Sequence, residues 1–200
     1  MTDNFLLLDE PRRPWLEADL LKEKFFKRSA GVHPDRVHQS DEAAKLAANQ
    51  RYTELNSAYN CLREPKDRLR HLLELEHGSA PKDLRQPPND LVTLSFEVGR
   101  ICRDADTLIV EGAKGTSPLL KVLLFERAQG QIEKISALRE TISDKQTSDL
   151  AELKSIDATW MADPPNRSAL LPRLEIIAAQ LGFFARWLQQ LQERQFRLTF

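Results

Sequence analysis

The 200-residue sequence has few residues that would tie it to a metal, a membrane or an oxidising compartment. It contains two cysteines, Cys61 and Cys102, without a CxxC pair, so each is expected to be a buried thiol rather than a ligand or redox centre. A cytoplasmic location suits this usage. No apolar run approaches the ~18 residues of a membrane span. The start "MTDNFLLLDEP" lacks the basic region of a secretory signal.

The charges are balanced along the whole chain. The net charge is −1, with 13 basic and 14 acidic residues before position 78 and 16 of each from there onward. No global field therefore attracts nucleic acid or an anionic membrane, and we expect neither as a partner. Electrostatic recognition by this protein requires a local patch of charge.

The sequence also lacks the patterns of an enzyme. It contains no nucleophile motif, no glycine-rich phosphate loop and no paired carboxylates, so we expect neither catalysis nor a cofactor. No segment alternates apolar and polar residues with a period of two, which predicts essentially no sheet. The expected fold class is all-α.

The first half reads as four helices. We expect helices over 3–8, with Asp3 or Asn4 as cap, and over about 16–30, with Leu20, Leu21 and Phe25 on one side. A third helix follows a cap at Ser40 or Asp41. Its predicted core face has the spacing i, i+3, i+4, i+7 and consists of Leu55, Ala58, Tyr59 and Leu62. A fourth helix begins at Pro65, buries Leu69, Leu72 and Leu73, and ends near Gly78.

The stretch "GSAPKDLRQPPND" (78–90) combines three prolines with no apolar periodicity. It predicts an N-terminal domain over 1–78, a linker over 79–90 and a C-terminal antiparallel helical bundle over 91–200. An interruption at 111–118 is followed by a helix over 118–162, with a break possible near "SDKQTSD". Its predicted seam is Leu120, Leu124, Ala128, Ile132, Ile135, Leu138 and Ile142.

The last predicted helix has a heptad seam, which requires a partner helix. An intramolecular bundle is favoured over a dimeric coiled coil. The seam comprises Leu170, Leu174, Ile177, Leu181, Phe184, Leu188 and Leu191. Phe183 and Trp187 lie beside it, either as an exposed apolar patch or as a second core face, and the core interpretation is favoured.

The stretch "AGVHPDRVHQ" (30–39) interrupts two helical segments. Pro34 lacks an N–H and pushes His33 out of helical geometry, so His33, Pro34 and Asp35 are expected in an exposed loop. A metal site of His33, Asp35 and His38 lacks zinc spacing and further ligands. A catalytic pair lacks a nucleophile, and a plain polar turn is the remaining local interpretation.

The order of these motifs resembles the J domain of DnaJ-family co-chaperones over residues ~4 to 77. The family pattern is matched by His33, Pro34, Asp35, Arg36, Ala58, Tyr59, Leu62, Pro65 and Arg68. The stretch "LNSAYNCLREPKDRLRHLLELEHG" is especially similar to HscB-type J proteins. The resemblance implies a helical hairpin with a His-Pro-Asp loop, and no zinc-binding cysteines precede it.

The resemblance implies a regulator of a DnaK/HscA-type ATPase chaperone. The His-Pro-Asp loop would trigger ATP hydrolysis, and the basic face of the second helix would dock. In this chain the predicted chaperone-binding residues are Lys22, Lys24, Lys27, Arg28, His33, Pro34, Asp35 and Arg36. A solvated face of ion pairs is the alternative for the four helical cations, because acidic residues share the helix.

Two positions in this helix depart from the family. Relatives usually have an apolar residue where Arg28 stands and often a basic residue where Phe26 stands. The exchange predicts that either the core face or the docking face is shifted by about one residue.

The HscB layout implies that residues 91–200 bind a client, for which an iron–sulfur assembly scaffold is the candidate. The sequence does not identify client-binding residues, and "PNDLVTLSFEVGR" is only a loose analogue of the family's signature. The alternative is a structural helical adaptor whose J-like domain triggers no ATPase.

Overall fold

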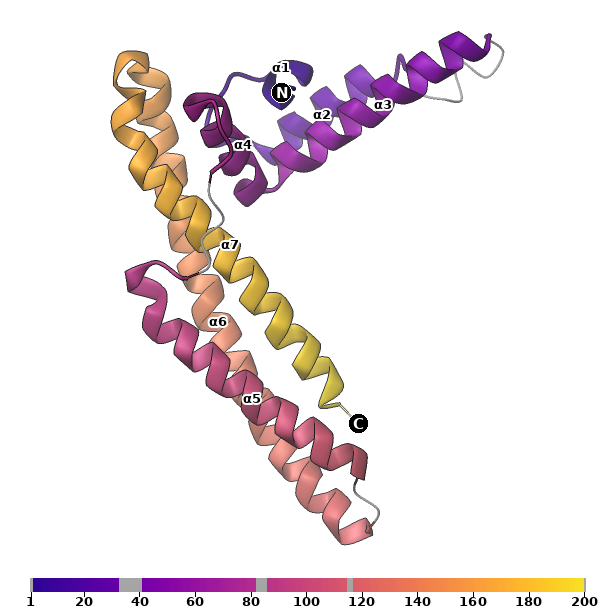
Figure 1. Cartoon of the computed structure of the whole chain (residues 1–200), viewed down its shortest axis with the longest axis vertical. Coiled ribbons are helices and arrows are strands. Elements are labelled where there is room, and N and C mark those ends of the chain that lie inside the picture. The colour runs from indigo at the N-terminus through magenta and orange to yellow at the C-terminus, as the bar shows by residue number, and fades with distance from the viewer. Residues whose placement is uncertain (1, 33–40, 82–85, 115–116, 200) are drawn as a thin grey trace. The chain divides into compact units, whose positions relative to one another are not determined.

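A computed structural model of the chain describes residues 2–32, 41–81, 86–114 and 117–199. Within these ranges every regular element is a helix, which confirms the all-α prediction. The helices are α1 (Asn4–Leu7), α2 (Ala18–Ser29), α3 (Glu42–Arg63), α4 (Pro65–His77), α5 (Val92–Lys114), α6 (Pro118–Ala162) and α7 (Arg167–Arg197), with short 3-10 turns η2 (Asn89–Leu91) and η3 (Pro164–Asn166) (Figure 1).

The chain forms two compact units that do not simply follow its order. One unit combines Met1–Lys82 with Glu152–Ala178, and the other combines Asp83–Ala151 with Ala179–Phe200. Helices α6 and α7 therefore contribute residues to both units. The C-terminal end of α6 contacts the N-terminal segment, from which it is far separated in sequence.

Local signals account for the helix ends in the first unit. Asp3 caps α1 by accepting from the backbone N–H groups of Phe5 and Leu6, and Asp41 caps α3 by accepting from that of Ala44. Pro65 begins α4. Gly78 ends α4 at φ 72°, a left-handed conformation that costs glycine little.

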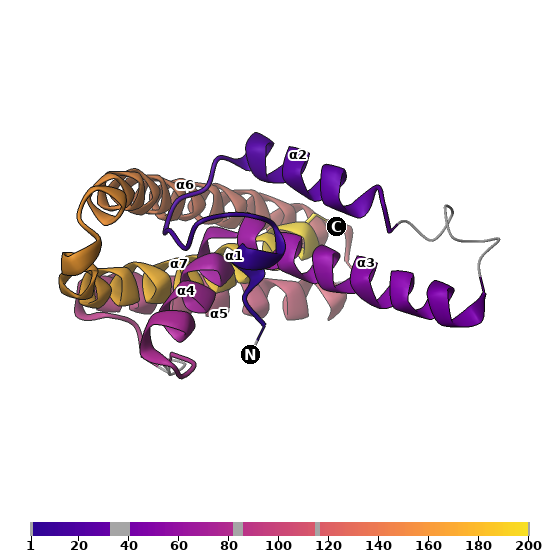
Figure 2. The same cartoon turned by 90° about the horizontal axis from the view of Figure 1, so that it is seen from above.

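The first unit is built on α2 and α3, which lie side by side (Figures 1 and 2). Their predicted core is confirmed with two exceptions. Leu20 is 57% exposed, because one helical step rotates it away from the face of Leu21 and Phe25. Tyr59 is half-buried. The buried core consists of Leu21, Phe25, Leu55, Ala58, Leu62, Leu69, Leu72 and Leu73.

The second unit contains α5 and parts of α6 and α7. The predicted seam of α6 is buried at Leu124, Ala128, Ile135, Leu138 and Ile142. Ile132 is half-buried, and Leu120 is 44% exposed, contrary to the prediction. Helix α6 runs without a break through 143–149.

Polar contacts tie the helices of the second unit together. Gln131 donates through Nε2 to the carbonyl of Ile101 at 2.9 Å. Arg194 on α7 pairs with Asp106 on α5 at 2.9 Å. These bonds satisfy polar groups at the helix contacts, which an apolar seam alone would leave unpaired.

The aromatic residues beside the α7 seam are buried. Phe183 is 6% exposed and Trp187 is 7% exposed, which confirms the core interpretation. Their rings lie 5.5 Å apart. Leu174, Ile177, Leu181, Phe184 and Leu191 are also buried, whereas Leu170 and Leu188 are half-buried.

The sequence predicted no membrane-spanning segment, but helix α7 meets a simple criterion for one. Among the described helices it is long and apolar enough, by length and composition, to cross a membrane, with an 18-residue window of mean hydropathy 1.3. The core helix of a soluble bundle meets the same criterion. Length and composition alone are therefore weak support for a membrane span.

Candidate functional site

Helix α2 carries the four cations predicted to dock. Its core face passes through Leu21, Phe25 and Ser29, which are all buried. Arg28 lies off this face and is exposed. The last buried side chain of the helix is therefore Ser29, one residue after position 28.

Two of the four cations are paired within the first unit. Lys24 contacts Glu10 at 2.9 Å and donates to the backbone carbonyl of Asp9 at 2.8 Å. Arg28 reaches the Asp9 carboxylate at 3.5 Å. These contacts fasten α2 to the segment that precedes it, so they have a structural role whatever else the two side chains do.

The other two cations form no ion pair with any described residue. Lys22 lies with its Nζ 5.9 Å from the ring centroid of Phe26, and Lys27 is the residue after Phe26. All three side chains are exposed. The predicted docking face therefore separates into the pair Lys24 and Arg28, held internally, and the pair Lys22 and Lys27, which stays available.

The predicted trigger lies outside the described residues. His33, Pro34, Asp35 and Arg36 all fall in the 33–40 gap, as does His38 of the rejected metal interpretation. Helices α2 and α3, which precede and follow this gap, are described.

Aromatic stacking packs α2 against α3. The rings of Phe25 and Tyr59 are stacked with centroids 4.5 Å apart, so Tyr59, a family-matched position, packs against α2. His71 on α4 accepts a hydrogen bond at Nε2 from the backbone N–H of Asn4 at 3.0 Å. It also stacks on Phe5. These contacts fix the N-terminal segment against α4.

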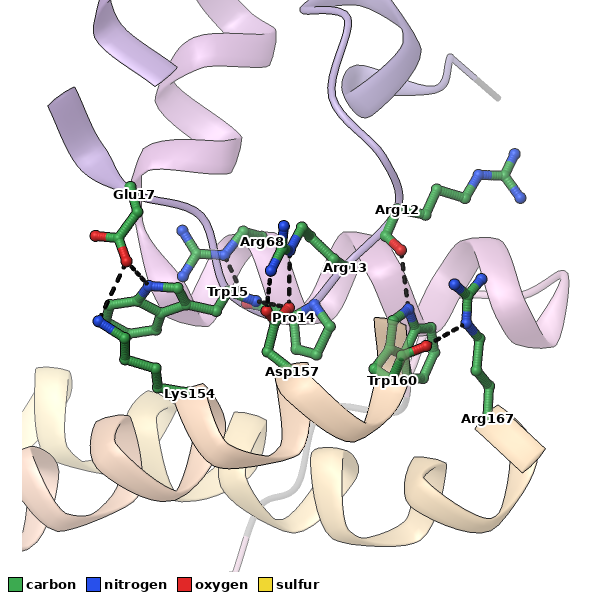
Figure 3. Close-up of polar contacts among 10 residues, drawn as sticks. All are labelled: Arg12, Arg13, Pro14, Trp15, Glu17, Arg68, Lys154, Asp157, Trp160 and Arg167. Carbon is green, nitrogen blue, oxygen red and sulfur yellow. Dashed lines mark hydrogen bonds and ion pairs between the residues drawn. The ribbon is translucent and has the colours of Figure 1, made fainter. Parts of the chain in front are cut away.

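A buried polar joint connects the N-terminal segment with α6 (Figure 3). The carboxylate of Asp157, which is 3% exposed, accepts from Arg13 Nε and from the backbone N–H of Trp15, both at 3.0 Å. Its other oxygen accepts from Arg13 Nη2. This hydrogen bonding raises the pKa of Arg13. One carboxylate thereby satisfies three donors of the chain that leads into α2.

The joint continues to either side of Asp157. Trp160 is fully buried and donates from Nε1 to the carbonyl of Arg12 at 2.9 Å, while its own carbonyl accepts from Arg167 Nε. Glu17 accepts from Trp15 Nε1 at 3.0 Å and pairs with Lys154 at 3.2 Å. Figure 3 shows these side chains between the N-terminal segment and the end of α6, with Arg167 at the start of α7.

Arg68, another family-matched residue, is structural here. It is 2% exposed and donates to the carbonyls of Pro14 at 2.8 Å and Leu62 at 2.7 Å. Burial lowers its pKa to about 10, partly opposed by Asp157. Arg68 thus holds the chain before α2 against the end of α3 (Figure 3).

Sequence reasoning missed this joint. Arg13 and Asp157 are separated by 144 positions, and neither belongs to a periodic pattern or motif. The same reasoning missed Asp9 and Glu10 as partners of Lys24 and Arg28 on α2. A buried aspartate inside a helix is uncommon, but burial itself is not visible in the sequence.

In the second unit, apolar side chains are exposed where α5 begins. Phe96 is 72% exposed and Val92 is 37% exposed, four residues apart on one side of the helix. Leu91, Leu94 and Val98 face inward and are buried. The stretch "PNDLVTLSFEVGR" therefore carries both a core face and an apolar outer face.

The described residues contain no group of three or more His, Cys, Asp or Glu side chains that could hold a metal ion. Burial raises the pKa of both Cys61 and Cys102, which disfavours the reactive thiolate. This agrees with the prediction that the two residues are buried thiols, although Cys61 is only partly covered.

Comparison with known proteins points to one kind of relative. No family model matches the chain. Curated proteins named co-chaperone protein HscB homolog match part of it. The protein of Shewanella denitrificans is 37% identical over 60 residues, which is 30% of this chain and 34% of that protein. That of Chromobacterium violaceum is 38% identical over 73 residues, 36% of this chain and 42% of that protein.

A third relative, from Paraburkholderia phytofirmans, is 39% identical over 72 residues, covering 36% of this chain and 41% of that protein. The matched stretches thus span less than half of the curated relatives. HscB from Vibrio cholerae has a similar structure, with TM-score 0.65 and 18% identity over 98% of this chain and 99% of that chain.

Human co-chaperone HscB gives TM-score 0.64 and 17% identity over 98% of this chain and 83% of that chain. At these identities the structural matches establish the fold. The resemblance predicted from the motifs is confirmed: in sequence over 60 to 73 residues, and in fold over 98% of its length, the chain is similar to the HscB type of J-domain co-chaperone.

Proposed function

We propose that this protein is a cytoplasmic J-domain co-chaperone that stimulates the ATPase of a DnaK/HscA-type chaperone and delivers a client, an iron–sulfur assembly scaffold. The observation that carries the proposal is the agreement between the HscB-like sequence of the first part and the HscB-like fold of nearly the whole chain. Its role is to regulate another protein's ATPase rather than to catalyse a reaction.

In this function His33, Pro34 and Asp35 act as the trigger of ATP hydrolysis. The cations Lys22, Lys24, Lys27, Arg28 and Arg36 form the dock, and we expect Lys22 and Lys27 to make the first contact. The two pairs of cations on α2 differ in their partners. Lys24 and Arg28 already bind Glu10 and Asp9, whereas Lys22 and Lys27 have no acidic partner among the described residues. Unpaired surface cations steer association with an acidic groove.

The client role belongs to residues 91–200. We propose that the outer face at the start of α5, centred on Phe96 and Val92, contacts the client, because large exposed apolar side chains mark interaction surfaces. Expected partners on this face are folded or partly folded proteins with a complementary apolar patch.

The trigger is tested by His33→Gln in the full-length protein. Single-turnover ATP hydrolysis by the chaperone should lose its stimulation by this variant. Circular dichroism and the thermal midpoint should match the wild type. Full stimulation by His33→Gln would contradict the mechanism.

The client face is tested in parallel by Phe96→Ala. It should weaken client binding at least tenfold, because a buried Phe contributes about 1.5–3 kcal/mol. ATPase stimulation should stay unchanged. Phe196→Ala, an aromatic on α7 that is 80% exposed, is the matched control. Equal losses from both variants would place the client elsewhere.

The adaptor alternative makes a different prediction for the wild type. An adaptor would bind partners through its helical half but leave the chaperone's ATPase rate unchanged at any concentration. The same single-turnover assay therefore separates the two functions.

A further inference from the structure

Phe26 is an aromatic residue that the fold does not use. It is 57% exposed, although the preceding residue, Phe25, is 7% exposed and stacks on Tyr59. The two phenylalanine rings lie 5.6 Å apart at an interplanar angle of 47°. Phe25 completes the core, and Phe26 projects beyond it.

Charged residues surround Phe26 on the outer side of α2. Asp19, Lys22 and Glu23 lie seven, four and three residues before Phe26, the spacings that share one side of a helix. Lys27 is the next residue and lies about 100° around the helix from Phe26. Lys22 makes a cation–π contact with the Phe26 ring, its Nζ 5.9 Å from the centroid. Lys22 and Lys27 are also the pair of cations left without an ion pair among the described residues of the predicted dock. An apolar group is thus framed by the available charges of α2.

This arrangement matches the anatomy of a protein interface. Binding energy concentrates in a few central aromatic anchors, while charged residues at the rim mainly steer association. A cation–π contact also strengthens when it is removed from water. An acidic groove with an apolar pocket would bury Phe26 and meet both lysines.

We propose that Phe26 is the apolar anchor of the chaperone dock and a determinant of which chaperone this protein recognises. The proposal rests on the proposed co-chaperone function. It adds that the dock is centred on an aromatic ring, with Lys22 and Lys27 at its edge. A chaperone surface that accepts the apolar ring of Phe26 differs in chemistry from one that would accept a cation at this position.

The test measures binding of the full-length protein to the ATP-bound chaperone by surface plasmon resonance, with single-turnover ATPase as a second readout. Phe26→Ala should weaken affinity about ten- to a hundredfold, because burial of a Phe side chain contributes that much. The loss should appear mainly in the dissociation rate. Stimulation at saturating concentration should be retained, since the trigger is unchanged.

An exposed leucine outside α2 offers a matched control. Leu6 on α1 is 75% exposed, so Leu6→Ala should leave the affinity unchanged. A second variant, Phe26→Lys, replaces the apolar ring with a cation and should also weaken binding to this chaperone. It keeps the test independent of any folding defect in Phe26→Ala. Thermal midpoints of all three variants should match the wild type.

The outcomes separate this proposal from the one on which it rests. If the wild type neither binds nor stimulates the chaperone, the co-chaperone function is wrong. If the wild type binds and stimulates but Phe26→Ala and Phe26→Lys bind equally well, Phe26 is not the anchor and the function stands. Equal weakening by Leu6→Ala would overturn the assignment of the docking side.

Discussion

Asp157 is the residue on which the contact between α6 and the N-terminal segment depends. Its buried carboxylate accepts from Nε and Nη2 of Arg13 and from the backbone N–H of Trp15. Removing one partner of a buried pair leaves desolvated donors without acceptors, which costs more than the pair contributes when it is intact.

We therefore expect Asp157→Ala to lower the free energy of unfolding by about 2 to 4 kcal/mol. Asp157→Asn, which retains one carbonyl acceptor, should lose less. Urea denaturation followed by circular dichroism measures both. The exposed Glu17→Gln, at the edge of the same joint, should leave the midpoint unchanged. A loss as large from Glu17→Gln would show that burial is not the cause.

His71 makes stability depend on pH. Burial lowers its pKa below the ordinary value of 6.5, and Arg12 acts in the same direction, whereas Asp3 and Glu74 oppose it. Above pH 6.5 both folded and unfolded states are neutral at this position. As the pH falls, the unfolded chain takes up the proton first, so stability decreases until the pH passes the folded pKa.

His71→Gln is expected to remove this dependence while keeping an acceptor for the Asn4 N–H. Denaturation curves recorded at pH 7 and at successively lower pH give the free energy of unfolding. Its decrease with falling pH should be smaller in the variant than in the wild type, by the contribution of His71. Identical pH slopes for variant and wild type would mean that His71 does not titrate differently in the two states.

Helix ends are decided by single backbone conformations. Gly78 lies at φ 72°, where a side chain is strained, even though no atom lies within 4 Å of the Cβ it would gain. Gly130 also has open space at that position, but it lies inside α6 with ordinary helical geometry. The two glycines have the same space and different backbone conformations.

The same substitution should consequently have opposite effects at the two sites. Gly78→Ala should destabilise the protein by about 1 kcal/mol, because αL geometry disfavours a Cβ. Gly130→Ala should stabilise it by about 0.5–1 kcal/mol through helix propensity. Thermal and urea denaturation test both. Changes of the same sign would contradict the backbone explanation.

At the scale of the whole molecule, the compact units cut across the order of the chain. Residues 152–178 belong with 1–82, so the bundle segment 91–200 contains a surface that the N-terminal segment covers. Trp160 is 0% exposed in the intact protein and donates to Arg12. A fragment of residues 91–200 lacks the N-terminal segment and therefore exposes this tryptophan.

A fragment of residues 91–200 should therefore show red-shifted Trp160 fluorescence compared with the intact chain, and Trp160→Phe identifies its share of the signal. Addition of residues 1–78 in trans should reverse the shift. The division of labour proposed here still requires that 91–200 bind the client and that 1–78 stimulate the ATPase. Unchanged Trp160 emission in the fragment would contradict the packing of 152–178.

Much of the secondary structure could be predicted because its causes are local. Asp41, Pro65 and Gly78 act within about one turn of their own positions, and leucine spacing reports the buried face of the same helix. Predictions failed for side chains whose side of the helix meets no partner. Leu20 lies one helical step off the buried face of α2, and Leu120 has the spacing of the α6 seam, but both are exposed.

The sequence by itself determined the helices, their caps and the family resemblance carried by residues such as Tyr59 and Pro65. Tertiary structure decided which cations of α2 are paired, since Lys24 reaches a carbonyl 15 positions away. It also decided that Asp157 is buried beneath the N-terminal segment and that Phe26 is exposed beside a buried Phe25. Burial and pairing are set by contacts between distant segments, and periodicity within one helix does not specify its neighbours.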